Sequence, residues 1–146
     1  MRLFRLHRGH RAAADYQGSL IQSSRWNPAG VPMLYCSTAL SLACLEALVH
    51  LGPDQIPPDY VCSSTELEAL FETAEFRGDL ADEEATRRVG HAWATSRRSL
   101  GLLVPSVVIP VEFNVLLNPV HESYADVIWN APEPFRFDPR LLRADK

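Results

Sequence analysis

Residues 33–52, MLYCSTALSLACLEALVHLG, contain the clearest pair of elements in the chain. Met33 to Cys36 predict a short strand that follows a turn. Ser37 or Thr38 is a suitable N-cap for a helix from Ala39 to His50, and the glycine that ends the quoted stretch is typical of a helix stop. A strand that leads into an apolar helix is therefore the starting point for the fold.

The rest of the chain predicts strands and helices in no regular alternation. A second helix opens at Asp82 and reaches Arg97 and Arg98, with an apolar face made of Ala85, Val89, Ala92 and Trp93. Strands are expected at residues 2–8, 60–67, 102–110, 113–117 and around 135–137, although residues 67–76 fit the start of a helix equally well. This order favours an α+β fold, a compact single domain over residues 1–146 with a central mixed β-sheet.

Composition limits the classes of partner. The chain has 146 residues and a formal net charge of −4, and 47% of its residues are apolar, so it is long enough to bury a core without disulfides. Its acidic balance does not supply the basic surface that binding to nucleic-acid backbones requires. We therefore expect no direct contact with nucleic acid.

The cysteines and the hydropathy pattern bear on the compartment. The chain has three cysteines, Cys36, Cys44 and Cys62, which is an odd number, and their spacing is not that of a metal site. We therefore expect them to be reduced thiols. No stretch reaches the roughly 18 apolar residues that span a bilayer, and the first residues lack the apolar run of a signal peptide. A cytoplasmic protein with no membrane association and no metal site is expected.

Glu46 is the one carboxylate in an almost wholly apolar helix, which Ser41 and His50 also interrupt and which should be buried on most of its circumference. A buried carboxylate is costly without a dedicated partner, and such groups concentrate in clefts where chemistry is done. The alternative is a narrow solvated stripe, because Glu46 and His50 are four residues apart and share a face.

Two further polar residues allow a structural and a functional explanation. Ser106 lies in a continuously apolar run, although a single buried hydroxyl is easily satisfied by a backbone carbonyl. Arg25 opens a turn, and its guanidinium suits a carboxylate or phosphate ligand as well as a surface loop. No glycine-rich phosphate loop is present, so P-loop and Rossmann nucleotide binding are not expected.

Ordered segments over nearly the whole chain resemble the RES domain family. They are residues 25–37 (RWNPAGVPMLYCS), 42–51 (LACLEALVHL), 90–93 (GHAW), 104–110 (VPSVVIP), 114–119 (NVLLNP) and 135–141 (FRFDPRL). The family is named for an Arg, a Glu and a Ser, and Arg25, Glu46 and Ser106 stand at those positions. Tyr35 matches a tyrosine of the family pattern.

The resemblance implies a fold similar to that of the ADP-ribosyltransferase toxins and an activity on NAD, which is a substrate and not a cofactor. It implies that the chain is the toxin of a bacterial toxin–antitoxin pair, whose partner is an Xre-like helix-turn-helix antitoxin that blocks the active site. The resemblance is also compatible with a homodimer of the chain. Family members degrade NAD by hydrolysis or phosphorolysis, or transfer ADP-ribose to a protein. The chain departs from the family pattern at Ser23 and Ser24, where two glycines are common, and at Phe113, where a more polar residue is usual.

The resemblance also implies a role for each of five residues. As the nicotinamide–ribose bond breaks, positive charge builds on the ribose, and Glu46 would stabilise that charge and hold a ribose hydroxyl. Arg25 would bind the diphosphate, with Arg5 as a further phosphate contact, and Tyr35 would stack on or bond to the nicotinamide end. Ser106 would orient Glu46 or the ribose. The competing functions are a non-catalytic partner-binding module and an RNA-cleaving toxin, which the acidic balance disfavours.

Overall fold

The structure is a computed structural model that describes residues 1–52, 54–69 and 71–142. The strands are β1 (Arg2–Arg8), β2 (Leu34–Ser37), β3 (Tyr60–Glu66), β4 (Phe71–Thr73), β5 (Gly101–Pro105), β6 (Phe113–Leu117) and β7 (Glu133–Pro134). The helices are α1 (Gln17–Ile21), α2 (Leu40–Leu48) and α3 (Glu83–Ser96), with short 3-10 turns η1 (Tyr124–Asp126) and η2 (Pro139–Leu142).

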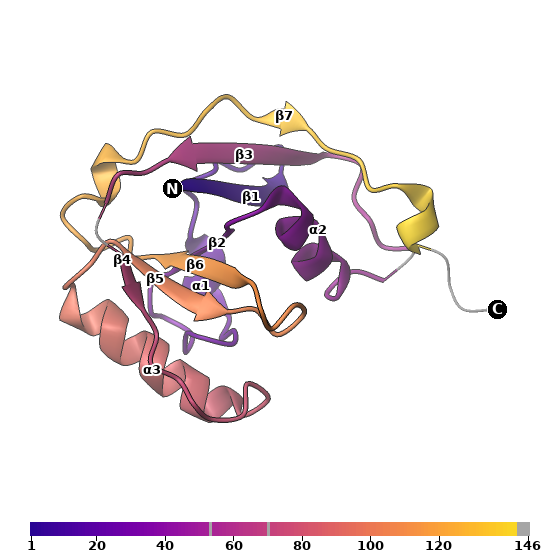
Figure 1. Cartoon of the computed structure of the whole chain (residues 1–146). Helices are drawn as coiled ribbons and strands as arrows, with labels where there is room; N and C mark the ends of the chain where they lie inside the picture. Colours follow the sequence, from indigo (N-terminus) through magenta and orange to yellow (C-terminus); the bar gives the residue numbers. More distant parts are fainter. Residues whose placement is uncertain (53, 70, 143–146) are drawn as a thin grey trace.

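Within these residues, seven strands form one mixed sheet in the order β4–β5–β6–β2–β1–β3–β7 (Figure 1). β4 and β5 are parallel, and the other neighbours are antiparallel. The predicted α+β fold with a mixed sheet is confirmed.

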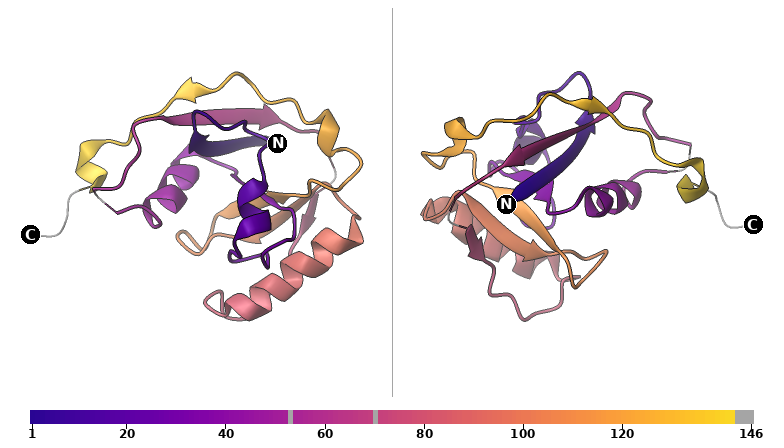
Figure 2. Two further views of the ribbon diagram at one scale, coloured as in Figure 1. Left: turned by 180° about the vertical axis from the view of Figure 1, so that it is seen from behind. Right: turned by 45° about the horizontal axis from the view of Figure 1, so that its top comes forward.

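The middle strands are apolar on both faces because both faces are covered. Val115 and Leu117 of β6 belong to one core cluster, together with side chains from the chain around η1. Leu116 of β6 points the opposite way and packs with Val104 of β5 and Trp93 of α3. α3 lies along that second face of the sheet (Figures 1 and 2). This two-sided burial explains the near-continuous hydrophobic pattern of β5 and β6.

β1 and β2 diverge from each other. β1 pairs with β3 along its whole length, and β2 pairs with β6 along all of its residues. Within the described strands, β1 and β2 meet at a single pair, Phe4 with Ser37. Figure 1 shows β1 and β3 spreading away from β2 and β6, with α2 between the two halves. The functional side chains described below gather at this divergence.

α2 lies within the predicted range, but its N-cap prediction is wrong. The N-cap is Ala39, which makes no side-chain capping bond. The hydroxyls of Ser37 and Thr38 donate to β6 instead, to Asn114 Oδ1 at 2.7 Å and to the Phe113 carbonyl at 3.0 Å. Both residues are drawn toward β6 because the antiparallel pairing of β2 with β6 continues up to Ser37.

The prediction that this helix is buried on most of its circumference is also wrong. Leu42 and Ala43 are the buried residues of α2, and Val49 just beyond its end is 60% exposed. The helix packs by one side against β1 and β2 and leaves its other sides to a cleft and to solvent. The apolar sequence predicted correctly that a helix forms here, but it did not predict how much of the helix is buried.

α3 begins after Asp82, whose side chain accepts from the Ala85 N–H at 3.1 Å as predicted for a helix start. Its buried face is Thr86, Gly90, Trp93 and Ala94, so the predicted face is rotated and Ala92 is exposed. The reason is Gly90, where a Cβ would lie 1.9 Å from the Trp26 carbonyl oxygen. The helix backbone touches the chain there, and this contact sets which side faces inward. The helix ends at a left-handed C-cap, Arg97, so Arg98 lies outside it.

Three other predictions differ from the structure in the type or the position of an element. The alternative of a helix within residues 67–76 is wrong, because β4 forms there beside β5. β5 ends at Pro105, and the Ser106 N–H donates to the Glu112 carbonyl at 2.9 Å, which closes a turn into β6. The last strand precedes residues 135–137, whose two phenylalanine rings pack edge-to-face near Tyr60.

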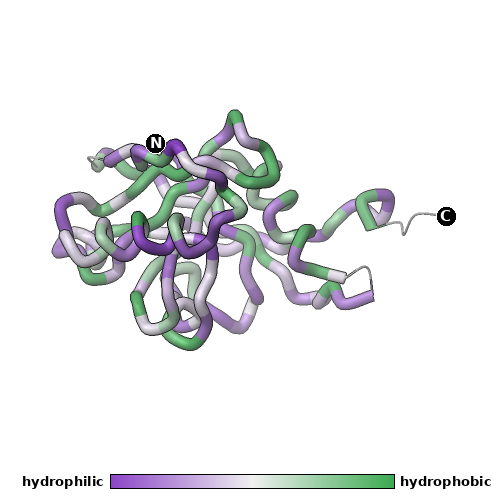
Figure 3. Tube along the Cα trace, turned by 90° about the horizontal axis from the view of Figure 1, so that it is seen from below, coloured by the Kyte–Doolittle hydropathy of each residue, from purple (hydrophilic) through white to green (hydrophobic). Residues whose placement is uncertain are grey.

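Among the described residues, no helix is long and apolar enough to cross a membrane. Figure 3 shows that hydrophobic and hydrophilic residues alternate over short distances along the chain.

Candidate active site

One cleft of about 1110 Å³ contains most of the site residues predicted from the sequence. It is lined from β1, β2, α2, the segment before β2, the start of α3 and the hairpin between β5 and β6. Arg5, Arg25, Tyr35 and Glu46 line it, and Ser106 lies directly behind its wall, with no exposed surface. Pockets of about 300–1000 Å³ accommodate drug-sized ligands, so this cleft has room for a larger molecule.

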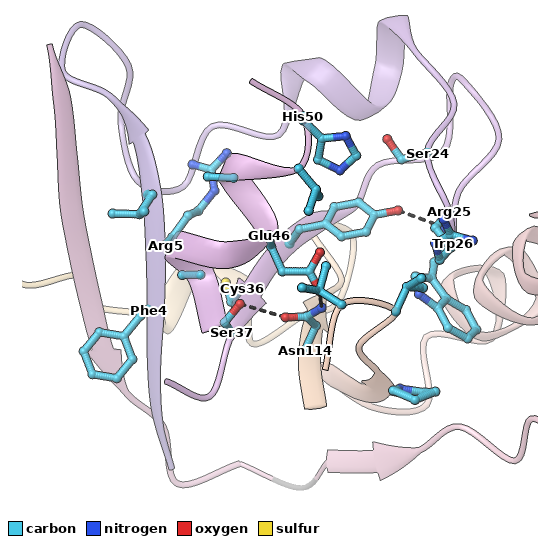
Figure 4. A pocket seen from close by; sticks show the side chains of 18 of the residues that line it. Phe4, Arg5, Ser24, Arg25, Trp26, Cys36, Ser37, Glu46, His50 and Asn114 are labelled. Atoms are coloured by element: carbon cyan, nitrogen blue, oxygen red, sulfur yellow. Dashed lines mark hydrogen bonds between the residues drawn. The ribbon is translucent and has the colours of Figure 1, made fainter. Parts of the chain in front are cut away.

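Glu46 projects from α2 into the cleft and is held at one of its two oxygens. Its Oε1 accepts a hydrogen bond from Ser106 Oγ at 2.7 Å and another from Asn114 Nδ2 at 2.7 Å. Figure 4 shows the carboxylate between Asn114 and the segment that carries Arg25. No residue in the described part of the chain donates to Oε2. One carboxylate oxygen is therefore fixed by the protein, and the other is left for a ligand.

Ser106 is committed to Glu46 by its own turn. The backbone N–H groups of Val108 and Ile109 donate to Ser106 Oγ at 3.1 Å and 3.0 Å. A hydroxyl has one hydrogen to donate, and here the two N–H groups supply its acceptor side. The Ser106 hydrogen is consequently directed at Glu46.

Arg25 is anchored by the N-terminal end of α3. Its Nη1 donates to the Leu80 carbonyl, and its Nη2 lies 3.6 Å from Glu83 Oε1. Its own carbonyl accepts from the Thr86 hydroxyl. Glu83 also pairs with Arg87, at 2.5 Å, and Arg87 lines the cleft as well. Two guanidinium groups thus stand at this side of the cleft around one shared carboxylate.

Tyr35 uses its hydroxyl to hold the segment that carries Arg25. The hydroxyl donates to Asn27 Oδ1 at 2.6 Å and accepts from the Trp26 N–H at 3.2 Å. Burial raises the pKa of Tyr35 well above its ordinary value, so the phenol stays neutral. The ring lines the cleft and is available to stack on a ligand.

Arg5 is placed differently from the other predicted residues, because its donors are bonded within the protein. Its Nη1 donates to the Ala13 carbonyl at 2.7 Å and its Nη2 to the Asp15 carbonyl at 3.1 Å. Burial is the main cause that lowers the pKa of Arg5. The side chain shapes one wall of the cleft by holding the loop that follows β1, and a phosphate would have to compete with these carbonyls.

The charges in the cleft favour an anionic ligand. Its lining contains three arginines and two glutamates, in a chain whose net charge is −4. Glu46 is the glutamate that pairs with no arginine among the described residues. The same residues contain no group of three His, Cys, Asp or Glu side chains arranged to hold a metal ion.

Three lining residues were missed from the sequence. Asn114 and Ser37 form a hydrogen-bonded connection to Glu46, and Arg87 adds a cation. The amide of Asn114 interrupts an apolar strand in the same way that Ser106 interrupts an apolar run, and that signal was available. His50, one turn after Glu46, also lines the cleft.

Comparison with known proteins gives consistent results. The family model described as RES domain matches residues 2–138. A protein of Sphingobium sp. (strain YBL2), named Prs ADP-ribosylating toxin, is 35% identical over 86% of this chain and 84% of its own length. A protein of Photorhabdus laumondii subsp. laumondii, named Toxin Res, is 32% identical over the full length of both. A solved structure of the M. tuberculosis MbcT-MbcA toxin-antitoxin complex has a TM-score of 0.70 over 97% of this chain and 86% of that chain. The identity there is 16%, so that likeness shows the fold alone.

Proposed function

The chain belongs to the RES domain family, and on that premise we propose that it is the toxin of a toxin–antitoxin pair that degrades NAD. It breaks the bond between nicotinamide and ribose and so depletes the cytoplasmic pool. NAD is its substrate and not a cofactor. A relative named Toxin Res, similar over its full length, supports the role of a toxin, and a relative named Prs ADP-ribosylating toxin supports chemistry on the ADP-ribose part of NAD.

The observation that carries the proposal is the Glu46 carboxylate, which accepts two hydrogen bonds at Oε1 and none at Oε2 from the described residues, in a cleft that arginines also line. When the C–N bond breaks, nicotinamide leaves as a neutral molecule with the bonding electron pair, and positive charge develops on the ribose. A fixed carboxylate beside that sugar stabilises the charge more strongly than water does, because it needs no reorganisation. Water then adds to the anomeric carbon and loses a proton, or inorganic phosphate adds in its place.

The remaining residues bind and orient the dinucleotide. The Arg25 guanidinium, with Arg87 beside it, supplies positive charge for the diphosphate. The Tyr35 ring supplies a flat apolar surface for the nicotinamide end. Ser106 acts through Glu46, because its hydroxyl reaches that carboxylate and has no surface in the cleft.

The decisive experiment is nicotinamide release by the Glu46→Gln variant. Glutamine keeps the shape of the side chain but removes the charge, so release is expected to fall by at least about 100-fold, the usual cost of one lost electrostatic contact in the transition state. The midpoint of urea unfolding should stay close to that of the parent. Glu84→Gln, an exposed carboxylate on α3, is the matched control. Release at the parent rate by Glu46→Gln would exclude Glu46 from the reaction.

A second candidate is transfer of ADP-ribose to a protein, which the name of the Sphingobium relative favours. Nicotinamide leaves in the same way, but a side chain of the target protein replaces water at the anomeric carbon. A lysate incubated with the chain and adenine-labelled NAD separates the two. Label in free ADP-ribose or its phosphate supports degradation, and label on a protein band that vanishes with Glu46→Gln supports transfer.

The proposed partner is an Xre-like helix-turn-helix antitoxin that covers the cleft. A solved structure with this fold is a toxin–antitoxin complex, which supports an antitoxin as the partner, and the helix-turn-helix type follows from the family resemblance. The product of the neighbouring gene, added at equal concentration, should stop nicotinamide release. Sustained release in a complex isolated by size-exclusion chromatography would show that the partner leaves the cleft open.

A further inference from the structure

Asn114 connects Glu46 of α2 to the sheet. Its Nδ2 donates to Glu46 Oε1 at 2.7 Å, and its Oδ1 accepts from Ser37 Oγ at 2.7 Å (Figure 4). Ser37 and Asn114 are direct partners in the antiparallel pairing of β2 with β6. Ser37 is 4% exposed, so water does not compete freely for its hydroxyl. A short chain of hydrogen bonds thus leads from the sheet to the candidate catalytic carboxylate.

This chain fixes which end of the amide faces Glu46. The amide could turn by half a rotation and place Oδ1 beside the carboxylate, but two acceptors would then face each other. The hydroxyl of Ser37 donates to Oδ1 and so holds that oxygen on the far side. Nδ2, the donor, is left pointing at Glu46.

We propose that Asn114, oriented by Ser37, is a positioning residue for Glu46, and this rests on the proposed function. Together with Ser106 it holds Oε1, so that Oε2 keeps one direction toward the ribose. The other titratable or charged groups that line the same cleft are Arg5 of β1, Tyr35 and Cys36 of β2, His50 after α2, Arg25, and Glu83 and Arg87 of α3.

The first test is the Asn114→Ala variant. Misplacing a reacting group by about 1 Å costs about 100-fold, so kcat for nicotinamide release should fall between about 10- and 100-fold. KM should stay within about threefold of the parent value, because Asn114 is not assigned to substrate binding.

The Asn114→Asp variant should make activity depend on the protonation of the new carboxyl. Where that carboxyl carries a proton, its O–H group can donate to Glu46 as the amide did, and activity should be retained at acidic pH. As the pH rises the new carboxyl ionises and repels Glu46, and activity should fall. A residue that served only the fold would not produce this pH profile.

Two neighbouring hydroxyls provide an outer test and its matched control. Ser37→Ala removes the bond that orients the amide, and kcat should fall about fivefold, the equivalent of one ordinary hydrogen bond. Thr38→Val removes a hydroxyl that donates to the Phe113 carbonyl of β6 and does not contact the Asn114 amide, so this variant should leave kcat unchanged. Equal effects of the two substitutions would overturn the role of Ser37.

The outcomes for this inference and for the proposed function are separable. If the parent chain releases nicotinamide and Glu46→Gln does not, but both Asn114 variants keep the parent kcat and pH profile, the positioning role is wrong and the function stands. If the parent chain itself is inactive on NAD, the function fails. The carbon-13 chemical shift of the Glu46 carboxyl at one pH then decides the positioning role, because Asn114→Ala removes one of its two donors and should move that resonance, and an unchanged resonance would overturn the role. Ser37→Ala and the same measurement also serve if Asn114→Ala does not fold.

Discussion

The Arg25 guanidinium already interacts with Leu80 and Glu83, so it can bind a ligand only through the N–H donors that these two residues leave free. Arg25→Lys keeps the positive charge, but a single ammonium group cannot contact these residues and a ligand at the same time. KM for NAD should therefore rise about tenfold, the cost of one charge-assisted hydrogen bond, with a smaller change in kcat. Steady-state kinetics measures both, with Arg88→Lys on the exposed side of α3 as the control. An unchanged KM would remove Arg25 from the binding site.

Single residues were most predictable where they broke an apolar pattern. Glu46 and Ser106 were both identified in that way, and the structure joins them by a hydrogen bond, although Ser106 lies in a turn and not inside the predicted strand. Their catalytic roles remain predictions. Asn114 also breaks an apolar strand, but the role of its amide depends on two things that the pattern does not contain, the register of β2 with β6 and the position of α2.

At the scale of elements, the packing of α3 against the segment before β2 places Arg25. Gly90→Ala tests it, because the new Cβ would lie 1.9 Å from the Trp26 carbonyl oxygen and 2.8 Å from its carbon. An alanine inside a helix normally adds about 0.5–1 kcal/mol of stability, but overpacking against backbone should here reduce it by about 1–3 kcal/mol. KM for NAD should rise as Arg25 shifts.

Urea unfolding at one pH measures the change, and Gly18→Ala in α1 is the matched control. A Cβ there meets no atom within 4 Å, so that variant should be as stable as the parent or more stable. If Gly90→Ala were also neutral, α3 would not be fixed by this contact, and the placement of Arg25 would need another cause.

Elements were predicted well where local signals begin and end them. The acidic run that begins at Asp82 identified the start of α3, and α2 lies inside its predicted range. Burial was less predictable, because it depends on what packs against the element. The face of α3 follows from the close approach at Gly90, and α2 is partly open although it is almost wholly apolar.

The order of strands in the whole molecule is what creates the cleft, and no local pattern encodes it. β1 lies between β2 and β3, yet it is paired fully with β3 and touches β2 at Phe4 and Ser37. Side chains from both halves of the sheet line the resulting opening, and α2 supplies Glu46 to it. The acidic net charge excluded a broad anion-binding surface, but it could not reveal the arginines gathered in one place.

The stability of the whole molecule should depend on pH through His7, which is 6% exposed. Its Nδ1 lies 3.0 Å from the Arg8 carbonyl, which can only accept, so the neutral ring donates there and accepts from Ser63 Oγ at Nε2, 2.8 Å away. Burial is the first cause that lowers the pKa of His7 below its ordinary value of 6.5, and the charge of Arg5 adds to it. As the pH falls through 6.5, the unfolded chain binds a proton that the folded chain does not, so the free energy of unfolding should decrease.

His7→Gln removes the imidazole. The variant should have a lower free energy of unfolding than the parent at pH 7, because the two hydrogen bonds are lost, but that free energy should change less between pH 7 and pH 5. Urea unfolding at a series of pH values measures this change for the parent and for the variant.

The carboxyls of Asp15, Asp59 and Glu72 have lowered pKa values, so the stability they contribute is lost at more acidic pH and not between pH 7 and pH 5. His91→Gln, at an exposed position of α3, is the matched control. If the free energy of unfolding of His7→Gln fell with pH as steeply as that of the parent, another group would cause the loss of stability, since the variant has no buried imidazole whose pKa could be lowered.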